Sequence, residues 1–325
     1  MTHFIPPAVR LGVVMDPISS IKYAKDSTLA MLLAAQARGF ELVYMEQSDL
    51  SLKDGRAFAR VRPLVVKADP TGWFTLGEPK VAALKDVVDV ILMRKDPPFD
   101  MEYIYSTYML ERAEAEGVLI CNRPQGLRDM NEKVYTAWFP QACAPTLITR
   151  DMGDMAAFVR EHGKAVCKPL HGMGGRSIFV VVADDKNMNV IFETLTNYGQ
   201  QYAIVQRYIP DIVETGDSRV LLIDGEPVPY ALARIPSASD NRGNLAAGAK
   251  GVGRPLNDRD RWLAAQVGPT LSARGMIFVG LDVIGGYVTE INVTSPTGIR
   301  ELDQQFNIDI GDMLMAAIER RLKRA

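Results

Sequence analysis

The sequence predicts an α/β protein of two or three domains packed around a cleft, and three observations support this prediction. The chain has 325 residues, more than a single hydrophobic core usually serves. Strand-like and helix-like segments alternate through its first part. Its composition, 47% hydrophobic and 23% charged, is that of an ordinary globular protein and argues against disorder.

The first part runs to a boundary near residue 124. A helix is expected to begin with Ser27 as its N-cap and to stop at Gly39, and a second helix is expected over residues 101–116, before Gly117. Residues 54–76 suggest a hairpin followed by an irregular excursion. Buried parallel strands are expected over residues 11–15, 42–45, 88–93 and 118–121.

The second part, residues 125–210, is expected to open with a helix over residues 127–139. Its remaining pattern predicts strands at 165–168, 177–182 and 202–206 and a helix at 188–198. The first two of these strands are joined by a glycine loop.

The third part, residues 211–325, is expected to pair strands at 219–223 and 230–235 through an Asp224-Gly225 turn. Residues 237–253 are rich in Gly, Ser, Asn and Ala, and a loop of that length is typical of a lid or a disordered segment. Helices are expected over 258–274 and 309–324, on either side of a hairpin at 281–293.

That hairpin is the most informative stretch of the chain. A loop of odd length centred on Gly286 would set Asp282 opposite Glu290, with Asn292 two residues further along the same face. Adjacent carboxylates repel each other unless a positive charge neutralises them, and oxygen ligands without His or Cys suit Mg²⁺ or Mn²⁺. A two-residue loop would instead send the two carboxylates to opposite faces of a solvent-exposed edge, and the residues alone leave both alternatives open.

The loop Gly172-Met173-Gly174-Gly175 joins two strands, so it fits neither a Walker A loop nor a dinucleotide fingerprint. A flap whose backbone N–H groups approach phosphate oxygens fits better, with Lys168 on the preceding strand as a cation. A plain hairpin loop is the alternative.

Other candidates carry weaker signals by themselves. Each of the cations Lys133, Arg219, Arg234 and Arg242 suits phosphate or carboxylate, yet each is also consistent with an ordinary surface charge. The strand end Gln206-Arg207-Tyr208-Ile209 could offer backbone amides to an adenine or could simply link two domains.

Several function classes are excluded. The net charge is −2 and no basic block occurs, which argues against duplex nucleic acid and anionic membranes as partners. The three cysteines, Cys121, Cys143 and Cys167, lack metal-like spacing, and neither an export signal nor a membrane-spanning run is present, so a cytoplasmic protein is expected. No Ser-His-Asp or Cys-His set is evident, whereas phosphoryl transfer needs mainly cations, metal ions and positioning.

Taken in order, these motifs resemble an ATP-grasp enzyme. Further strings closely resemble the bacterial glutathione synthetase family, and the resemblance covers roughly residues 9 to 321. The strings are Met15-Asp16-Pro17 and those at residues 93–100, 241–248 and 290–301.

The resemblance implies an ATP-grasp fold with an N-terminal Rossmann-like α/β domain over residues 1–124. It also implies that ATP phosphorylates the carboxylate of γ-glutamylcysteine, that glycine displaces the phosphate, and that the chain forms a homo-oligomer, a tetramer by family resemblance. The site residues follow in the same way: Lys133, Lys168 and residues 172–175 on phosphates, residues 206–209 on adenine, Asp217 on ribose, Asp282, Glu290 and Asn292 on Mg²⁺ or Mn²⁺, Arg219 and Arg234 as phosphate-side cations, and Arg242 in a lid over residues 237–253.

Rival functions keep part of this site. Another ATP-grasp ligase, similar to D-alanine–D-alanine ligase or to a glutamate-adding enzyme, would change the acceptor, and a small-molecule kinase would leave the phosphate on its product. A nicotinamide oxidoreductase is discounted because the turn after the first strand lacks the required glycines.

Overall fold

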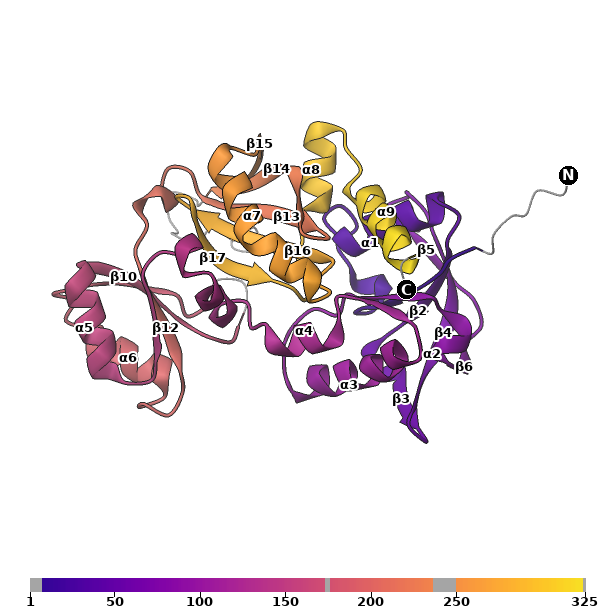
Figure 1. Cartoon of the computed structure of the whole chain (residues 1–325), viewed down its shortest axis with the longest axis horizontal. Helices are drawn as coiled ribbons and strands as arrows, with labels where there is room; N and C mark the ends of the chain where they lie inside the picture. The colour runs from indigo at the N-terminus through magenta and orange to yellow at the C-terminus, as the bar shows by residue number, and fades with distance from the viewer. Residues whose placement is uncertain (1–7, 173–175, 236–249, 324–325) are drawn as a thin grey trace, which may run out of the picture.

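The computed structural model describes residues 8–172, 176–235 and 250–323, in which helices pack on three β-sheets (Figure 1). The N-terminal sheet lies at one end of the long axis, the sheet of residues 146–207 lies at the other, and the last sheet lies between them. The chain therefore reaches the far end of the molecule before it returns to the middle. None of the helices described is long and apolar enough to span a bilayer.

The N-terminal sheet has the order β3-β4-β2-β1-β7-β8, with β5 and β6 paired to β4. The central strand β1 pairs in parallel with both β2 and β7, as a buried α/β sheet requires. Residues 54–76, where a hairpin and an irregular excursion were expected, contain the turn of the β3-β4 hairpin and the strands β4 and β5, which pair antiparallel, and β6 pairs with β4 just beyond them. The bounds are β1 Arg10–Val14, β2 Glu41–Met45, β3 Leu50–Lys53, β4 Arg56–Val66, β5 Phe74–Leu76, β6 Lys80–Ala83, β7 Val90–Met93 and β8 Leu119–Cys121.

Helices α1 (Ser27–Ala37), α2 (Leu84–Val87) and α3 (Met101–Ala115) accompany this sheet. The expectation that Ser27 caps α1 is wrong. Asp26 is the N-cap and accepts from the Leu29 N–H at 2.6 Å, whereas Ser27 is buried and its hydroxyl accepts from the Ile299 N–H at 3.3 Å. Ser27 is a residue type that often caps helices, but here its hydroxyl bonds a part of the chain that is distant in sequence.

The last helix also returns to this end of the molecule. α9 (Ile310–Leu322) packs beside α1, and Leu314 and Met315 share a core with Leu29 and Leu32 (Figure 1). Arg38 at the end of α1 pairs with Asp312 and Glu319 of α9. The C-terminal residues therefore complete the N-terminal core.

The sheet of the central part is antiparallel, in the order β11-β10-β12-β9, and its core includes Met155 and Phe192 from two covering helices. The glycine loop joins β10 to β11, as predicted. The bounds are β9 Thr146–Thr149, α5 Met152–His162, β10 Lys164–Pro169, β11 Phe179–Val182, α6 Met188–Thr196 and β12 Ala203–Arg207.

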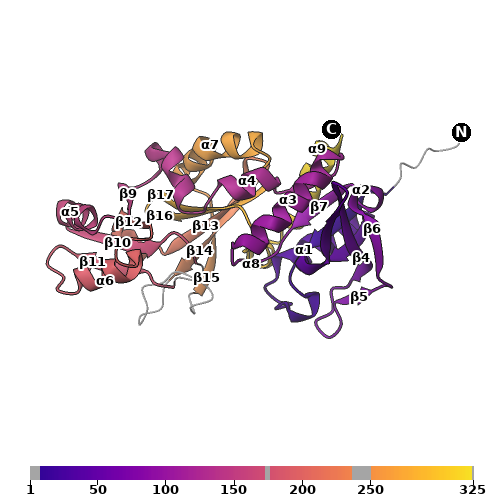
Figure 2. The same ribbon diagram turned by 90° about the horizontal axis from the view of Figure 1, so that it is seen from below.

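The single helix predicted over residues 127–139 is wrong. The chain forms α4 (Pro124–Asp129), breaks, and resumes as a 3-10 turn over Val134–Trp138. The break occurs because the Asn131 side chain accepts from the N–H groups of Lys133 (3.1 Å) and Val134 (3.0 Å), which competes with continued helix. α4 lies between α3 and the helix α7, Asp258–Ala273 (Figure 2).

The last sheet is antiparallel, in the order β15-β14-β13-β16-β17. The Asp224-Gly225 turn joins β13 to β14 as predicted, with φ of 53° and 90°. Gly225 and Gly268 of α7 touch so closely that a Cβ on Gly268 would lie 2.1 Å from the Gly225 oxygen, so only glycine fits there. The bounds are β13 Asp217–Ile223, β14 Glu226–Ile235, β15 Lys250–Pro255, β16 Phe278–Ile284, β17 Tyr287–Asn292 and α8 Ile299–Phe306, a helix that the sequence analysis missed.

Asn122 fastens the N-terminal sheet to this last sheet. Its side chain is buried just after β8, donates to the carbonyls of Phe278 (2.7 Å) and Val293 (2.6 Å), and accepts from the Phe278 N–H (2.9 Å). One amide thus satisfies three backbone groups at the base of the 281–293 hairpin.

We expect Asn122→Ala to lower the free energy of unfolding by about 1–3 kcal/mol, because it leaves buried backbone groups without partners. Urea denaturation should show an earlier midpoint with an unchanged slope. The same substitution at Asn189, an exposed residue of α6 outside this contact, is the control. An unchanged midpoint in Asn122→Ala would mean that the hydrogen bonds of the Asn122 side chain add nothing to stability.

Candidate active site

The predicted site residues gather on one face of the last sheet. Side chains alternate along a strand, and Leu281 and Val283 of β16 are buried in the core that contains α7. Asp282, between them, must therefore point to the opposite face. The other members of this face are Asp217 and Arg219 on β13, Arg234 on β14, and Glu290 and Asn292 on β17.

The hairpin reaches the predicted pairing by a different route. The odd-length loop is wrong: Gly285 and Gly286, with φ of 53° and 76°, form a two-residue turn between Ile284 and Tyr287. A bulge between Asp282 and Val283 then shifts the register by one residue, so that Asp282 pairs with Glu290. The prediction that these carboxylates lie side by side is confirmed.

Two arginines neutralise Asp282. Arg219 donates through Nε to Oδ1 at 2.6 Å and through a terminal nitrogen to Oδ2 at 3.3 Å, and a terminal nitrogen of Arg234 lies 2.9 Å from the same Oδ2. Burial would raise the pKa of Asp282, but the two guanidinium groups outweigh burial and hold that pKa below its usual range.

Asp217 shares Arg234 with Asp282. One of its oxygens lies 2.5 Å from the guanidinium, and the other is buried and has no partner among the described residues. Burial, assisted by the charges of Asp282 and Glu290, raises the pKa of Asp217 despite the arginine. The carboxylate thus belongs to the ionic cluster, and the ribose contact implied by the resemblance stays a prediction.

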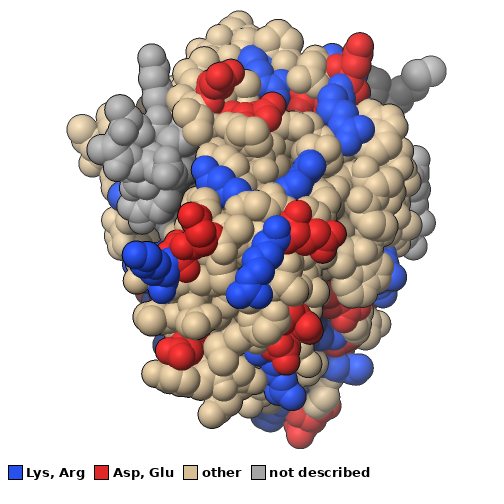
Figure 3. Space-filling model, turned by 90° about the vertical axis from the view of Figure 1, so that its left-hand side faces the viewer, with Lys and Arg blue, Asp and Glu red and all other residues tan. Residues whose placement is uncertain are grey.

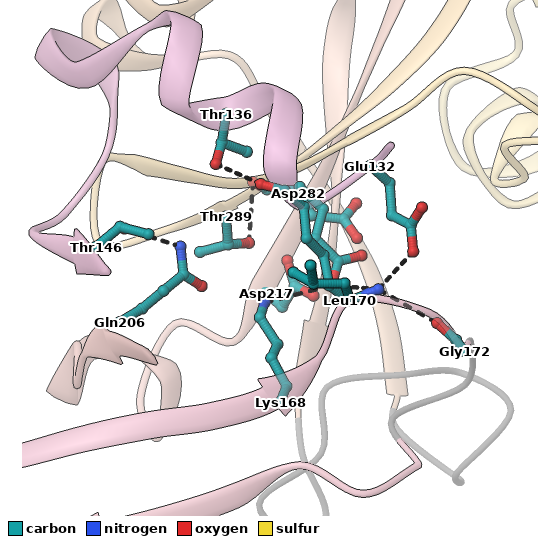
Figure 4. A network of polar contacts seen from close by, with 12 residues as sticks. Glu132, Thr136, Thr146, Lys168, Leu170, Gly172, Gln206, Asp217, Asp282 and Thr289 are labelled. Atoms are coloured by element: carbon teal, nitrogen blue, oxygen red, sulfur yellow. Dashed lines mark hydrogen bonds and ion pairs between the residues drawn. The ribbon is translucent and has the colours of Figure 1, made fainter. Parts of the chain in front are cut away.

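Two lysines approach Glu290 from outside the sheet. Lys168 of β10 lies 3.4 Å and Lys133 lies 3.9 Å from the same carboxylate oxygen. Both lysines are 5% exposed, so neither is the surface charge that was the alternative. Figure 4 shows Lys168 reaching from its strand toward Asp217 and Asp282.

Lys133 is held by several groups at once. Its ammonium donates to Glu132 at 2.5 Å and to the Gly172 carbonyl at 3.2 Å (Figure 4). Burial lowers its pKa, but Glu290 and Glu132 outweigh burial, so the pKa lies above its usual value and the side chain is charged. The helix break at Asn131 makes this inward orientation possible.

The glycine loop begins beside these lysines. Gly172 has φ of +104°, a conformation that glycine tolerates. Met173, Gly174 and Gly175 lie outside the described residues, as do residues 237–249 of the expected lid, which include Arg242. Residues 250–253 of that segment belong to β15.

Several polar groups of residues 206–209, the strand end predicted to contact adenine, already form hydrogen bonds within the protein. The Gln206 side chain donates to Thr146 at 3.2 Å, and Arg207 donates to the Tyr287 hydroxyl at 3.4 Å. The N–H groups of Arg207 and Tyr208 donate to the Pro145 and Lys164 carbonyls. An adenine contact here would fall to carbonyl groups and to Ile209, and it stays a prediction.

A divalent cation fits the donor set of the sheet face. Asp282, Glu290 and Asn292 offer only oxygen ligands, and the Asn292 amide has one buried end without a partner. Amide oxygen and nitrogen exchange places by a 180° rotation, which would turn the oxygen to that side. Among the described residues, no three His, Cys, Asp or Glu side chains form a metal cluster by themselves, so phosphate oxygens would have to complete the coordination.

Sequence reasoning missed two parts of this site. It assigned no role to Glu132, the neighbour in sequence of the predicted Lys133 and its ion-pair partner in the structure. It also assigned none to residues 294–300, which follow β17 and contact Arg219, although their string was recognised as part of a motif.

Charges of both signs are interspersed on the end of the molecule seen in Figure 3. The described part of this face therefore presents no continuous surface of one sign. Strong local charge in the described structure is instead found in the buried cluster around Asp282.

Comparisons with known proteins agree with this geometry. Residues 9–128 match the model of the prokaryotic glutathione synthetase N-terminal domain, and residues 132–307 match that of its ATP-grasp domain. The D-cycloserine synthetase DcsG has a similar fold, with a TM-score of 0.67 at 14% identity over 96% of this chain and 99% of that one. The ATP-grasp ligase PsnB, solved with a minimal precursor, Mg and ADP, gives 0.62 at 15% identity over 96% and 98%.

Relatives with much higher identity span the whole chain. The glutathione synthetase of Pseudomonas putida is 61% identical over 97% of this chain and 99% of its own length. That of Shewanella oneidensis is 58% identical over 97% and 99%. The chain belongs to the prokaryotic glutathione synthetase family and has its ATP-grasp fold.

Proposed function

We propose that this protein joins γ-glutamylcysteine to glycine in the cytoplasm through an acyl phosphate, with the cluster around Asp282 and Glu290 as its phosphate and metal site. Membership of the family makes the protein an ATP-dependent ligase. The observation that carries the assignment of the site is the convergence of four cations on two adjacent carboxylates.

The reaction divides into two balanced steps. A carboxylate oxygen of the cysteinyl residue attacks the γ-phosphorus of ATP, and the bond to ADP breaks. The amine of glycine then attacks the acyl carbon, inorganic phosphate leaves with the bonding electrons, and the amine loses a proton. Neither step needs a covalent bond to the enzyme, which agrees with the lack of an evident nucleophile and base pair.

The chain's own residues supply charge and position. Lys133 and Lys168 would hold phosphate oxygens, while Arg219 and Arg234 would stabilise the negative charge of the transferring phosphoryl group. The geometry supports these roles because all four cations are buried and their side chains are fixed by carboxylates. Such preorganised charges need little rearrangement during the reaction.

Asp282, Glu290 and Asn292 would hold Mg²⁺ or Mn²⁺. When bound, the ion neutralises phosphate charge and orients the reacting oxygens.

An omission assay tests the reaction. With ATP, Mg²⁺, γ-glutamylcysteine and glycine present, we expect one ADP and one phosphate for each glutathione formed, and no glutathione when any component is left out. Product formation with D-alanine or glutamate in place of these substrates would favour the other ligases. Phosphate retained on the product, with no need for an amine, would favour a kinase.

Removing one metal-side charge should reduce catalysis. We expect Glu290→Gln to fold and to lower kcat roughly a hundredfold, because it removes a ligand whose charge contributes a few kcal/mol to the transition state. Glu226→Gln, an exposed carboxylate at the far end of the same sheet, is the matched control. Near-normal ATP turnover by Glu290→Gln in saturating Mg²⁺ would assign Glu290 a structural role only.

We also propose that the chain assembles into a homo-oligomer, a tetramer as the resemblance implies. An exposed stripe on α3, formed by Met101, Tyr105 and Tyr108 at 53%, 45% and 47% exposure, supports an interface between copies. Light scattering should give four times the chain mass of 35.9 kDa, and Tyr105→Glu should lower it. A monomeric mass for the unaltered protein would contradict this.

A further inference from the structure

Arg94, at the end of β7, is a buried cation that the proposed chemistry does not use. It is 7% exposed and makes no ion pair within the described residues. Burying a charge is costly unless its contacts compensate. Its contacts therefore indicate what it does.

Arg94 bridges two parts of the chain. Its Nε donates to the Thr28 hydroxyl at 3.0 Å, and one terminal nitrogen donates to the Pro296 carbonyl at 3.0 Å. The cavity beside it has a volume of about 10 Å³, no more than one water occupies. The cavity thus leaves no room for a substrate beside Arg94 in this structure, and the hydrogen bonds of Arg94 within the described residues go to Thr28 and Pro296, while its other terminal nitrogen is buried without a partner there.

The segment that contains Pro296, residues 295–300, is fixed to the N-terminal part at further points. Ser295 donates to Asp96 at 2.6 Å, and the Ile299 N–H donates to Ser27 at 3.3 Å. The segment starts three residues after Asn292, the last predicted metal ligand. The N-terminal part thus holds the chain that leaves the metal strand.

The other side of the same segment contacts Arg219. The Thr297 carbonyl accepts from Arg219 at 3.1 Å, on the guanidinium that also binds Asp282. A Cβ on Gly280 would lie 2.8 Å from the Pro296 ring and 2.9 Å from the Arg219 side chain. Pro296 and Arg219 therefore both lie close to Gly280, and the hydrogen bond from Arg219 to the next residue, Thr297, links the guanidinium to this segment.

We propose that Arg94 is a positioning residue for phosphoryl transfer. By fixing the Pro296 carbonyl it fixes residues 296–297, and these hold the Arg219 guanidinium against Asp282. This inference rests on the role proposed for Arg219. The alternative is that Arg94 merely joins two parts of the chain, in which case its loss lowers stability without a specific effect on kcat.

A double-mutant cycle separates the two. We expect Arg94→Gln to lower kcat roughly tenfold and to leave KM for ATP within about twofold, because the hydrogen bonds of Arg94 act on Arg219 and not on nucleotide binding. After Arg219→Lys has removed the group being positioned, Arg94→Gln should lower kcat by no more than about a further twofold.

Arg321→Gln is the matched control. Arg321 also links separate elements by several hydrogen bonds, but its partners Asp224 and Ser272 lie at the end of β13 away from Arg219. We expect Arg321→Gln to lower the melting temperature and to change kcat by less than about twofold, alone or combined with Arg219→Lys. Thr28→Val, which removes only the Nε acceptor, should lower kcat in the same direction as Arg94→Gln and still fold.

The outcomes are distinguishable. A normal kcat for Arg94→Gln, or for Thr28→Val if Arg94→Gln does not fold, would overturn the inference and leave the proposed function intact. Effects of Arg94→Gln and Arg219→Lys that simply multiply would do the same. A normal kcat for Arg219→Lys would overturn the proposed role of Arg219, and the inference with it.

Discussion

The architecture of the site follows from one electrostatic constraint: Asp282 and Glu290 lie opposite each other on adjacent strands in a largely buried place. Like charges at that spacing are unfavourable, and burial makes them more so. Cations from β10, β13, β14 and the segment after α4 therefore converge on this pair. The lysine side of this convergence links the central sheet to the last sheet.

Contacts around the cluster also tie the N-terminal part of the chain to Arg219. Arg219 donates hydrogen bonds to Asp282 and to the Thr297 carbonyl. The segment that contains Thr297 is in turn hydrogen-bonded to Ser27 and Arg94 of the N-terminal part. Asn122 fixes the base of the same hairpin from the end of β8. Each contact joins residues more than 60 positions apart, so the charges are placed by long-range packing and not by local loop structure.

Much of this could be predicted where a local pattern fixes the outcome. The alternation of Leu281, Asp282 and Val283 and the glycines at 285–286 determine faces and a turn, and the pairing of Asp282 with Glu290 followed. The bulge could not be predicted, because it depends on how β16 and β17 fit the rest of the sheet. The role of Ser27 was missed for a similar reason, because its hydroxyl accepts from the distant Ile299 N–H. The helix break at Asn131 has a local cause, since the side chain accepts from N–H groups two and three residues further on, and the helical pattern of the segment did not reveal this competition. The role of Asp217 came only from resemblance, since nothing local distinguishes it from a surface charge, and the candidates Arg207 and Arg242 had equally plausible alternatives until the resemblance was considered.

The ion pairs of the cluster also bear on how the proposed site would accept a nucleotide. In the structure, arginines pair with Asp282 and lysines pair with Glu290, so carboxylates and cations neutralise each other. On the proposed assignment, triphosphate oxygens would compete for the same guanidinium and ammonium groups, and the carboxylate oxygens released from them would be available to a divalent ion. The metal and the nucleotide would then favour each other's binding, because phosphate would take the cations from the carboxylates and the ion would take the carboxylates from the cations. Internal ion pairs would thus stabilise the site before ATP binds, and an exchange of partners would separate a phosphate position from a metal position.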